Sequence, residues 1–155
     1  MKNEIIFKNS SNWFNRYAEV EGSEIIISAC FDDPLSWPYT LKRYSVEDYR
    51  ERTEEANIKL SKELYLKIKA VIASHTELVS CKEHVENGVS DGQDDAYYFA
   101  CDSFSKEIFG ASIYSVGSFE EEDYPKIPRT TNYHVYRTVK DIEEALSSAG
   151  VSMWG

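Results

Sequence analysis

The sequence lacks the long apolar run that a membrane-spanning helix or a secretion signal requires. Its apolar runs are short, as at residues 25–27 and 71–73, whereas a helix needs roughly 20 such residues to cross a bilayer. Residues 1–7 also lack the longer apolar stretch of a signal peptide. We therefore expect a soluble, cytoplasmic protein with no membrane partner.

Cysteine is scarce, and its three copies, Cys30, Cys81 and Cys101, stand far apart in the sequence. An odd and widely spaced set does not suit the disulfide framework of a small secreted domain. A chain of 155 residues can bury a sizeable core without such cross-links. The cysteines therefore indicate free thiols in a reducing compartment.

The short motifs of common catalytic and cofactor sites are also missing. The seven glycines are dispersed, so they form neither a phosphate-binding loop nor a nucleophile elbow. Cys81 and His84 stand three residues apart, but a structural zinc site needs about four ligands and no second pair matches. We expect no catalytic residue, no cofactor and no metal, and therefore a protein that is not an enzyme.

Positive charge is nearly missing from one quarter of the chain. Residues 85–125 contain ten acidic residues and a single base, Lys106, which is a net charge of −9 out of −10 for the whole chain. Phosphate-backbone binding depends on lysine and arginine, so this balance disfavours nucleic acid. It favours a cationic protein partner, although acidic loops also serve solubility alone.

Aromatic residues accompany this charge. The chain has eleven tyrosines, several of them beside acids, and tyrosine and tryptophan supply much of the energy of protein interfaces. Trp37 stands in a segment with a proline on each side. The candidate partner-binding residues are Asp91, Asp94, Asp95, Tyr97, Asp102, Glu120, Glu121, Glu122, Asp123, Tyr124 and Trp37.

Hydrophobic periodicity in the first half of the chain predicts a strand over 4–8, a short helix or a turn-rich entry over 9–20, a buried strand over 24–31 and a loop over 32–44. The clearest predicted element is one long helix from about 46 to 79, which could instead break near residues 73–74. Ser45 would cap this helix, and Leu60 and Leu64 would lie at the centre of its buried stripe.

The second half of the chain predicts strands over 96–101 and 108–116, joined as a hairpin. A loop over 117–131 and an edge strand over 132–137 follow. A last helix would be capped by Thr138 and closed by Gly150. We expect one domain over residues 1–155, of the α+β class, with a mostly antiparallel sheet on which the long helix and the C-terminal helix pack.

The size, the acidic segment, the tyrosine-rich strands and the missing catalytic motifs resemble the small acidic immunity proteins of bacterial toxin–immunity systems, including contact-dependent growth inhibition. The resemblance implies a cytoplasmic protein that covers the active site of a cognate toxin, often a basic nuclease. Two alternatives stay open: a non-catalytic adaptor or assembly subunit, and a small hydrolase or metal-dependent enzyme. The second alternative would use a thiol–histidine pair (Cys30 with His134, or Cys101 with His75) or a magnesium site (Asp95, Asp102 and Glu107).

Overall fold

The computed structural model describes residues 2–14, 20–47, 51–84, 93–110 and 131–155. They form one six-stranded antiparallel sheet, in the order β4-β3-β2-β1-β5-β6, with two helices and a short 3-10 helix. The elements are β1 (Glu4–Phe14), β2 (Val20–Ala29), β3 (Tyr39–Glu47), β4 (Glu51–Lys59), α1 (Lys62–Ser74), η1 (Thr76–Ser80), β5 (Gln93–Ala100), β6 (Ser105–Phe109) and α3 (Thr131–Ser148). The predicted α+β class with a mostly antiparallel sheet is therefore confirmed.

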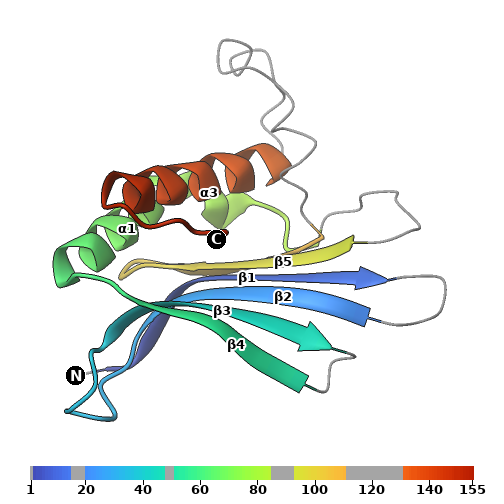
Figure 1. The fold of residues 1–155 in the computed structure, drawn as a ribbon. Coiled ribbons are helices and arrows are strands. Elements are labelled where there is room, and N and C mark those ends of the chain that lie inside the picture. The colour runs from blue at the N-terminus through green and yellow to red at the C-terminus, as the bar shows by residue number, and fades with distance from the viewer. Residues whose placement is uncertain (1, 15–19, 48–50, 85–92, 111–130) are drawn as a thin grey trace.

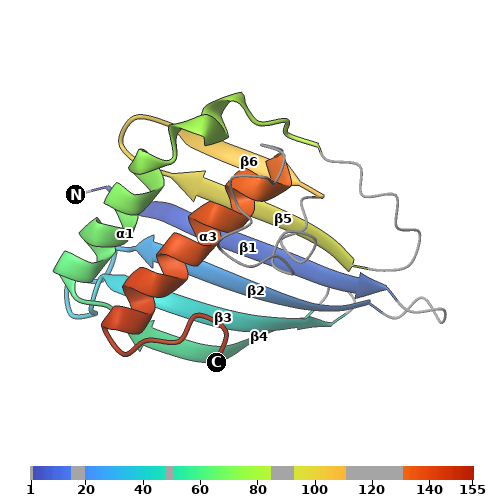
Figure 2. The same cartoon turned by 90° about the horizontal axis from the view of Figure 1, so that it is seen from above.

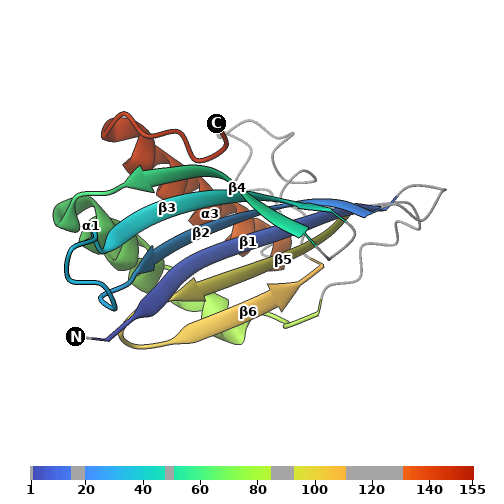
Figure 3. The same ribbon diagram turned by 60° about the horizontal axis from the view of Figure 1, so that its bottom comes forward.

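Both helices pack on the same face of the sheet (Figure 1). Seen from above, α3 crosses the strands obliquely and α1 lies at the end of the sheet where the N-terminal segment enters (Figure 2). No helix of the described residues covers the opposite face (Figure 3). None of the described helices is long and apolar enough to span a bilayer.

The core lies between the helices and the covered face, here called the inner face. Strand residues alternate between the two faces, so that Phe7, Ile27, Leu41 and Phe99 point inward and are fully buried. The helices add apolar side chains at three- and four-residue spacing. The fully buried helix residues are Ile68, Ile72, Val135, Ile142 and Leu146.

The predicted long helix over 46–79 is wrong before Lys62, and the helix ends at Ser74, at the break that the sequence offered as an alternative. Residues 51–59 form β4, which pairs with β3 in an antiparallel register. The helix begins at Lys62, where the Oγ of Ser61 accepts a hydrogen bond from the Leu64 N–H at 3.1 Å. Ser45, the predicted cap, lies in β3. The apolar residues of this segment fit a helical stripe, but pairing with β3 satisfies the backbone of residues 51–59 instead, since tertiary context overrides local propensity.

Leu60 and Leu64 are nevertheless buried, as predicted. Leu64 lies in the first turn of α1, while Leu60 joins β4 to the helix and its N–H donates to the Tyr39 carbonyl at 2.9 Å. The sequence therefore predicted the burial of both leucines, although Leu60 lies before the helix and not in it.

Three further predictions are corrected. Residues 9–14, expected to be helical or turn-rich, continue β1, and residues 39–44, expected to be a loop, begin β3. Residues 132–137, expected to be an edge strand, lie in the first turns of α3. Thr138 is therefore buried inside that helix, where its hydroxyl donates to the His134 carbonyl at 2.7 Å. Most of the predicted strand over 108–116 and the loop over 117–130 lie outside the described residues.

The predicted end of the last helix is confirmed. Gly150 has a φ of +78°, which glycine adopts without the steric cost of a Cβ atom. The Val151 N–H donates to the Leu146 carbonyl at 2.9 Å, and the Gly150 N–H donates to the Ser147 carbonyl at 3.0 Å. This pair of bonds is a Schellman motif, and it turns the following residues back beneath α3.

Candidate partner-binding surface

The structure separates the eleven predicted binding residues into three groups. Trp37 and Asp102 are exposed. Asp95 and Tyr97 are buried, at 6% and 2% exposure. Six others lie outside the described residues: Asp91, Glu120, Glu121, Glu122, Asp123 and Tyr124. The seventh, Asp94, lies in β5, but its side chain is not described.

Asp95 and Tyr97 are corrected as partner contacts because they point to the inner face. They stand two apart in β5, opposite Ser11 and Asn9 of β1, which are themselves buried. The acidic character of the segment indicated a surface, but strand alternation turns every second residue beneath the helices.

The loop of residues 30–38, between β2 and β3, exposes Leu35 and Trp37. The carboxylate of Asp33 accepts hydrogen bonds from the Leu35 N–H and the Ser36 hydroxyl, both at 2.9 Å. These bonds hold the pKa of Asp33 below its usual range, with the Leu35 N–H as the larger cause. The loop also closes on itself, because the Cys30 N–H donates to the Pro38 carbonyl at 3.0 Å. The loop is therefore ordered and its acid is ionised at neutral pH.

Aromatic contacts connect this loop to the core. The Trp37 Nε1–H donates to the Leu60 carbonyl at 2.6 Å. The Trp37 ring meets Tyr39 edge-on with centroids 6.5 Å apart, and Tyr39 packs on the buried Tyr65 at 4.8 Å. Trp37 is thus fixed in orientation although 49% of it is exposed, and Leu35 beside it is 95% exposed.

The start of β1 connects the loop to the rest of this end of the sheet. Asn3 donates its side-chain N–H to Asp32 at 2.7 Å, and its side-chain oxygen accepts from the Phe31 N–H at 2.7 Å. The next residue, Glu4, accepts from the Tyr65 hydroxyl at 2.8 Å and from Lys69 at 2.9 Å.

Lys69 extends these contacts to the β5–β6 turn, where its Nζ lies 2.7 Å from the exposed carboxylate of Asp102. Burial lowers the pKa of Lys69, but hydrogen bonds to Asp102 and Glu4 outweigh it and raise the pKa on balance. Burial, with the Glu4 carboxylate, raises the pKa of Tyr65 far above its usual range. Both groups therefore keep their protons at neutral pH.

We name this continuous region the loop end of the sheet. It comprises residues 30–38, residues 2–5 and the β5–β6 turn at 101–104. A hollow of about 510 Å³ lies between the N-terminal residues and that turn. The loop end contains four acids, Glu4, Asp32, Asp33 and Asp102, against the bases Lys2 and, bound from α1, Lys69. It therefore combines net negative charge with exposed, oriented apolar side chains.

The candidate metal and thiol residues have other contacts. The thiol of Cys81 donates to the Glu77 carbonyl at 3.3 Å, and burial raises its pKa. The His84 ring stacks on Phe109 at 5.2 Å. Among the described residues, no three histidine, cysteine or acidic side chains form a group that could bind a metal. His75 pairs with Asp141 at 2.7 Å and joins α1 to α3.

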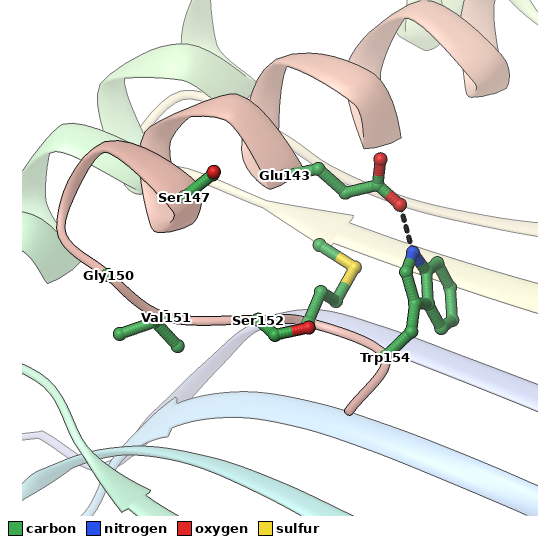
Figure 4. Close-up of a pocket in the computed structure, with 7 residues that line it drawn as sticks. Glu143, Ser147, Gly150, Val151, Ser152 and Trp154 are labelled. Carbon is green, nitrogen blue, oxygen red and sulfur yellow. Dashed lines mark hydrogen bonds between the residues drawn. The ribbon is translucent and has the colours of Figure 1, made fainter.

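A second hollow, of about 410 Å³, lies between α3 and the residues after Gly150 (Figure 4). Trp154 Nε1–H donates to the Glu143 carboxylate across it. Arg43 of β3 donates to the carbonyls of Ser152 and Met153 at 2.9 and 3.3 Å. The hollow is thus bordered by groups that already hold this segment in place, and we assign it a structural role.

Neither models of protein families nor curated proteins match this sequence.

Proposed function

We propose that this chain binds and neutralises a basic protein, the nuclease domain of a cognate toxin, and acts as the immunity protein of a toxin–immunity pair. The observation that carries the proposal is the loop end, where Leu35 and Trp37 are exposed on an ordered loop beside Asp32 and Asp33. An oriented apolar anchor next to fixed acids is the arrangement that a basic protein surface with an apolar cleft would match.

Preorganisation supports a role in binding. Ordering a loop upon association reduces affinity, so a loop that is already held by hydrogen bonds binds at a smaller entropic cost. The 30–38 loop is held at both ends and through Asp33, and its tryptophan is tied to the Leu60 carbonyl. Leu35 is 95% exposed, so a partner that covers it would bury almost the whole side chain.

Charge supports the choice of a basic partner. The net charge of −10 lies almost entirely in residues 85–125, and this field attracts a cation over about a Debye length. Asp102, within that segment, lies at the loop end. Asp95, in the same segment, lies at the other end of β5. The local charge of Asp32, Asp33 and Asp102 beside the apolar anchors, rather than the whole field, therefore supports a basic partner at the loop end. Covering the active site of the nuclease would then block its access to nucleic acid.

The test starts from the protein that co-purifies with this chain from its native host, identified by mass spectrometry. We expect a basic nuclease whose activity is lost when one equivalent of the chain is added. Surface plasmon resonance should then show that Leu35→Ala weakens binding by roughly tenfold or more, the effect of losing a central interface side chain.

Val79→Ala is the matched control, because Val79 is also an aliphatic residue, 55% exposed, but lies on η1. It should leave the affinity unchanged. A bound nuclease that stays fully active would contradict neutralisation. Equal affinities for wild type and Leu35→Ala would instead remove the loop end as the binding surface.

A further inference from the structure

The face of the sheet that no described helix covers is here called the open face (Figure 3). It has a charge pattern of its own. One row across the strands runs Lys8, Ile26, Lys42, with each residue directly opposite the next. The adjoining row runs Glu24, Tyr44, Glu54. A row with two lysines thus lies beside an acidic row that is two residues away along β2 and β3. The row with the lysines continues through Tyr98 to Glu107 at the β6 edge.

In the described part of the chain, ion pairs use some of these charged side chains and leave others free for a partner. Glu24 is ion-paired with Arg52, whose guanidinium lies 3.9 Å from the centre of the Tyr44 ring. Lys8, Lys42 and Glu54 have no ion-pair partner among the described residues. The open face therefore offers two lysines and one carboxylate around half-buried apolar side chains, including Ile26 and Tyr44.

We propose that the open face is a self-complementary interface on which a second copy of this chain packs, sheet against sheet. The twofold axis would lie perpendicular to the strands, between the two rows. Rotation about this axis places the row with the lysines of one copy over the acidic row of the other. Lys42 of one copy then lies over Tyr44 of the other, between Glu54 and the ion pair of Arg52 with Glu24. Glu24 lies over Ile26, between Lys8 and Lys42.

The charge pattern also decides against the other simple rotation. A twofold axis parallel to the strands, between β1 and β2, would place Lys8 over Ile26 of the second copy. Lys8 would then lie between the Lys8 and Lys42 of that copy, and like charges at this distance are unfavourable. The axis perpendicular to the strands avoids this contact.

The area of the open face suits such an interface. Six strands spaced about 4.8 Å apart, each presenting on average about nine residues at about 3.3 Å per residue, give a surface of roughly 820 Å². A stable interface buries about 800 Å² on each partner. Stacked sheets pack about 10 Å apart, so long side chains such as lysine and glutamate reach across. This interface is separate from the loop end and does not depend on the proposed function.

Sedimentation equilibrium of the full chain, from micromolar to millimolar concentration, tests the proposal. We expect a species of twice the chain mass that dissociates on dilution. Lys42→Glu and Glu54→Lys should each weaken the dimer by about tenfold or more, which is the effect of about 1.4 kcal/mol. The double variant Lys42→Glu/Glu54→Lys should dimerise more tightly than either single variant, because the pair is re-formed with exchanged charges.

Lys67→Glu is the control, since it makes the same change of charge at an exposed position of α1 and should leave the dimer constant unchanged. Circular dichroism establishes that each variant keeps the sheet. A single monomeric species at millimolar concentration overturns the proposal. So does a dimer that Lys42→Glu leaves intact, or a double variant that is no better than the single ones.

Discussion

At the scale of single residues, burial separates side chains that the sequence treats alike. Leu64 and Leu66 both lie on α1, but Leu64 is 8% exposed and belongs to the core, whereas Leu66 is 48% exposed. Tyr97 and Tyr98 are adjacent in β5, yet Tyr97 is buried while Tyr98 lines the hollow at the loop end. The direction in which each side chain points therefore decides what it can contribute.

Leu64→Ala should reduce the free energy of unfolding by about 2–5 kcal/mol, because truncating a core leucine removes apolar burial and leaves a cavity. Leu66→Ala should change it by about 0.5 kcal/mol or less, as is usual for an exposed position. Urea melts of both variants measure the difference. Equal losses would mean that α1 does not pack on the sheet through Leu64.

Tyr65 gives a pH-dependent prediction. Its pKa is raised in the folded state, so its contribution to stability is complete below its unfolded pKa of about 10. As the pH rises above that value, the unfolded chain loses the proton first and stability falls. Lys69 acts in the same direction, because its pKa is also raised.

Urea melts at pH 7 and near pH 10.5 should therefore show a loss of stability in the wild type and a smaller loss in Tyr65→Phe, which retains only the contribution of Lys69. Because the variant also lacks the hydroxyl that binds Glu4, the comparison is made between the two pH values within each protein. An equal loss in both proteins would exclude Tyr65 as the titrating group.

At the scale of elements, the first turn of α1 depends on one side chain. The Ser61 hydroxyl accepts from the Leu64 N–H, one of the four N–H groups that a helix leaves without an internal partner. Ser45, the cap that the sequence predicts, instead donates its hydroxyl to Glu55 of β4 at 2.8 Å. Both segments have a serine followed by an acid, so local pattern alone does not distinguish them.

Ser61→Ala should reduce the free energy of unfolding by about 1 kcal/mol, as the loss of an N-cap usually does. Ser45→Ala removes only an exposed side-chain bond and should cost about 0.5 kcal/mol or less. Thermal or urea melts compare the two alanine variants directly. A larger loss for Ser45→Ala would favour the longer helix over the strand β4.

At the scale of the whole molecule, the candidate surfaces differ in charge. The acidic excess belongs to residues 85–125, while the open face has bases at its centre. A basic partner is expected at the loop end because Asp32, Asp33 and Asp102 lie there beside exposed apolar side chains, and the open face suits a different interaction. Separate surfaces would allow the chain to dimerise and to bind its partner at the same time.

Association with a basic partner should slow as ionic strength rises, because salt screens the acidic segment, whereas dissociation should change less. Replacing residues 120–123 by glutamine and asparagine should likewise lower mainly the on-rate. This expectation rests on their charge, since they lie outside the described residues. Surface plasmon resonance at two salt concentrations measures both rates. Unchanged rates in all conditions would leave the acidic excess with a role in solubility only.

The sequence by itself determined the α+β class, the antiparallel sheet, the burial of Leu60 and Leu64, and the end of the last helix at Gly150. These features follow from local patterns: β-branched runs, apolar spacing, and a glycine where φ must be positive. Only the tertiary structure decided that residues 51–59 are a strand and residues 132–137 a helix. The apolar spacing of each segment fits both a helix and a strand, and packing against β3 or against the sheet selects one of them. It also decided which side chains are accessible. Asp95 is buried by its register with Ser11, while Leu35 is exposed on a loop whose hydrogen bonds no local sequence pattern predicts.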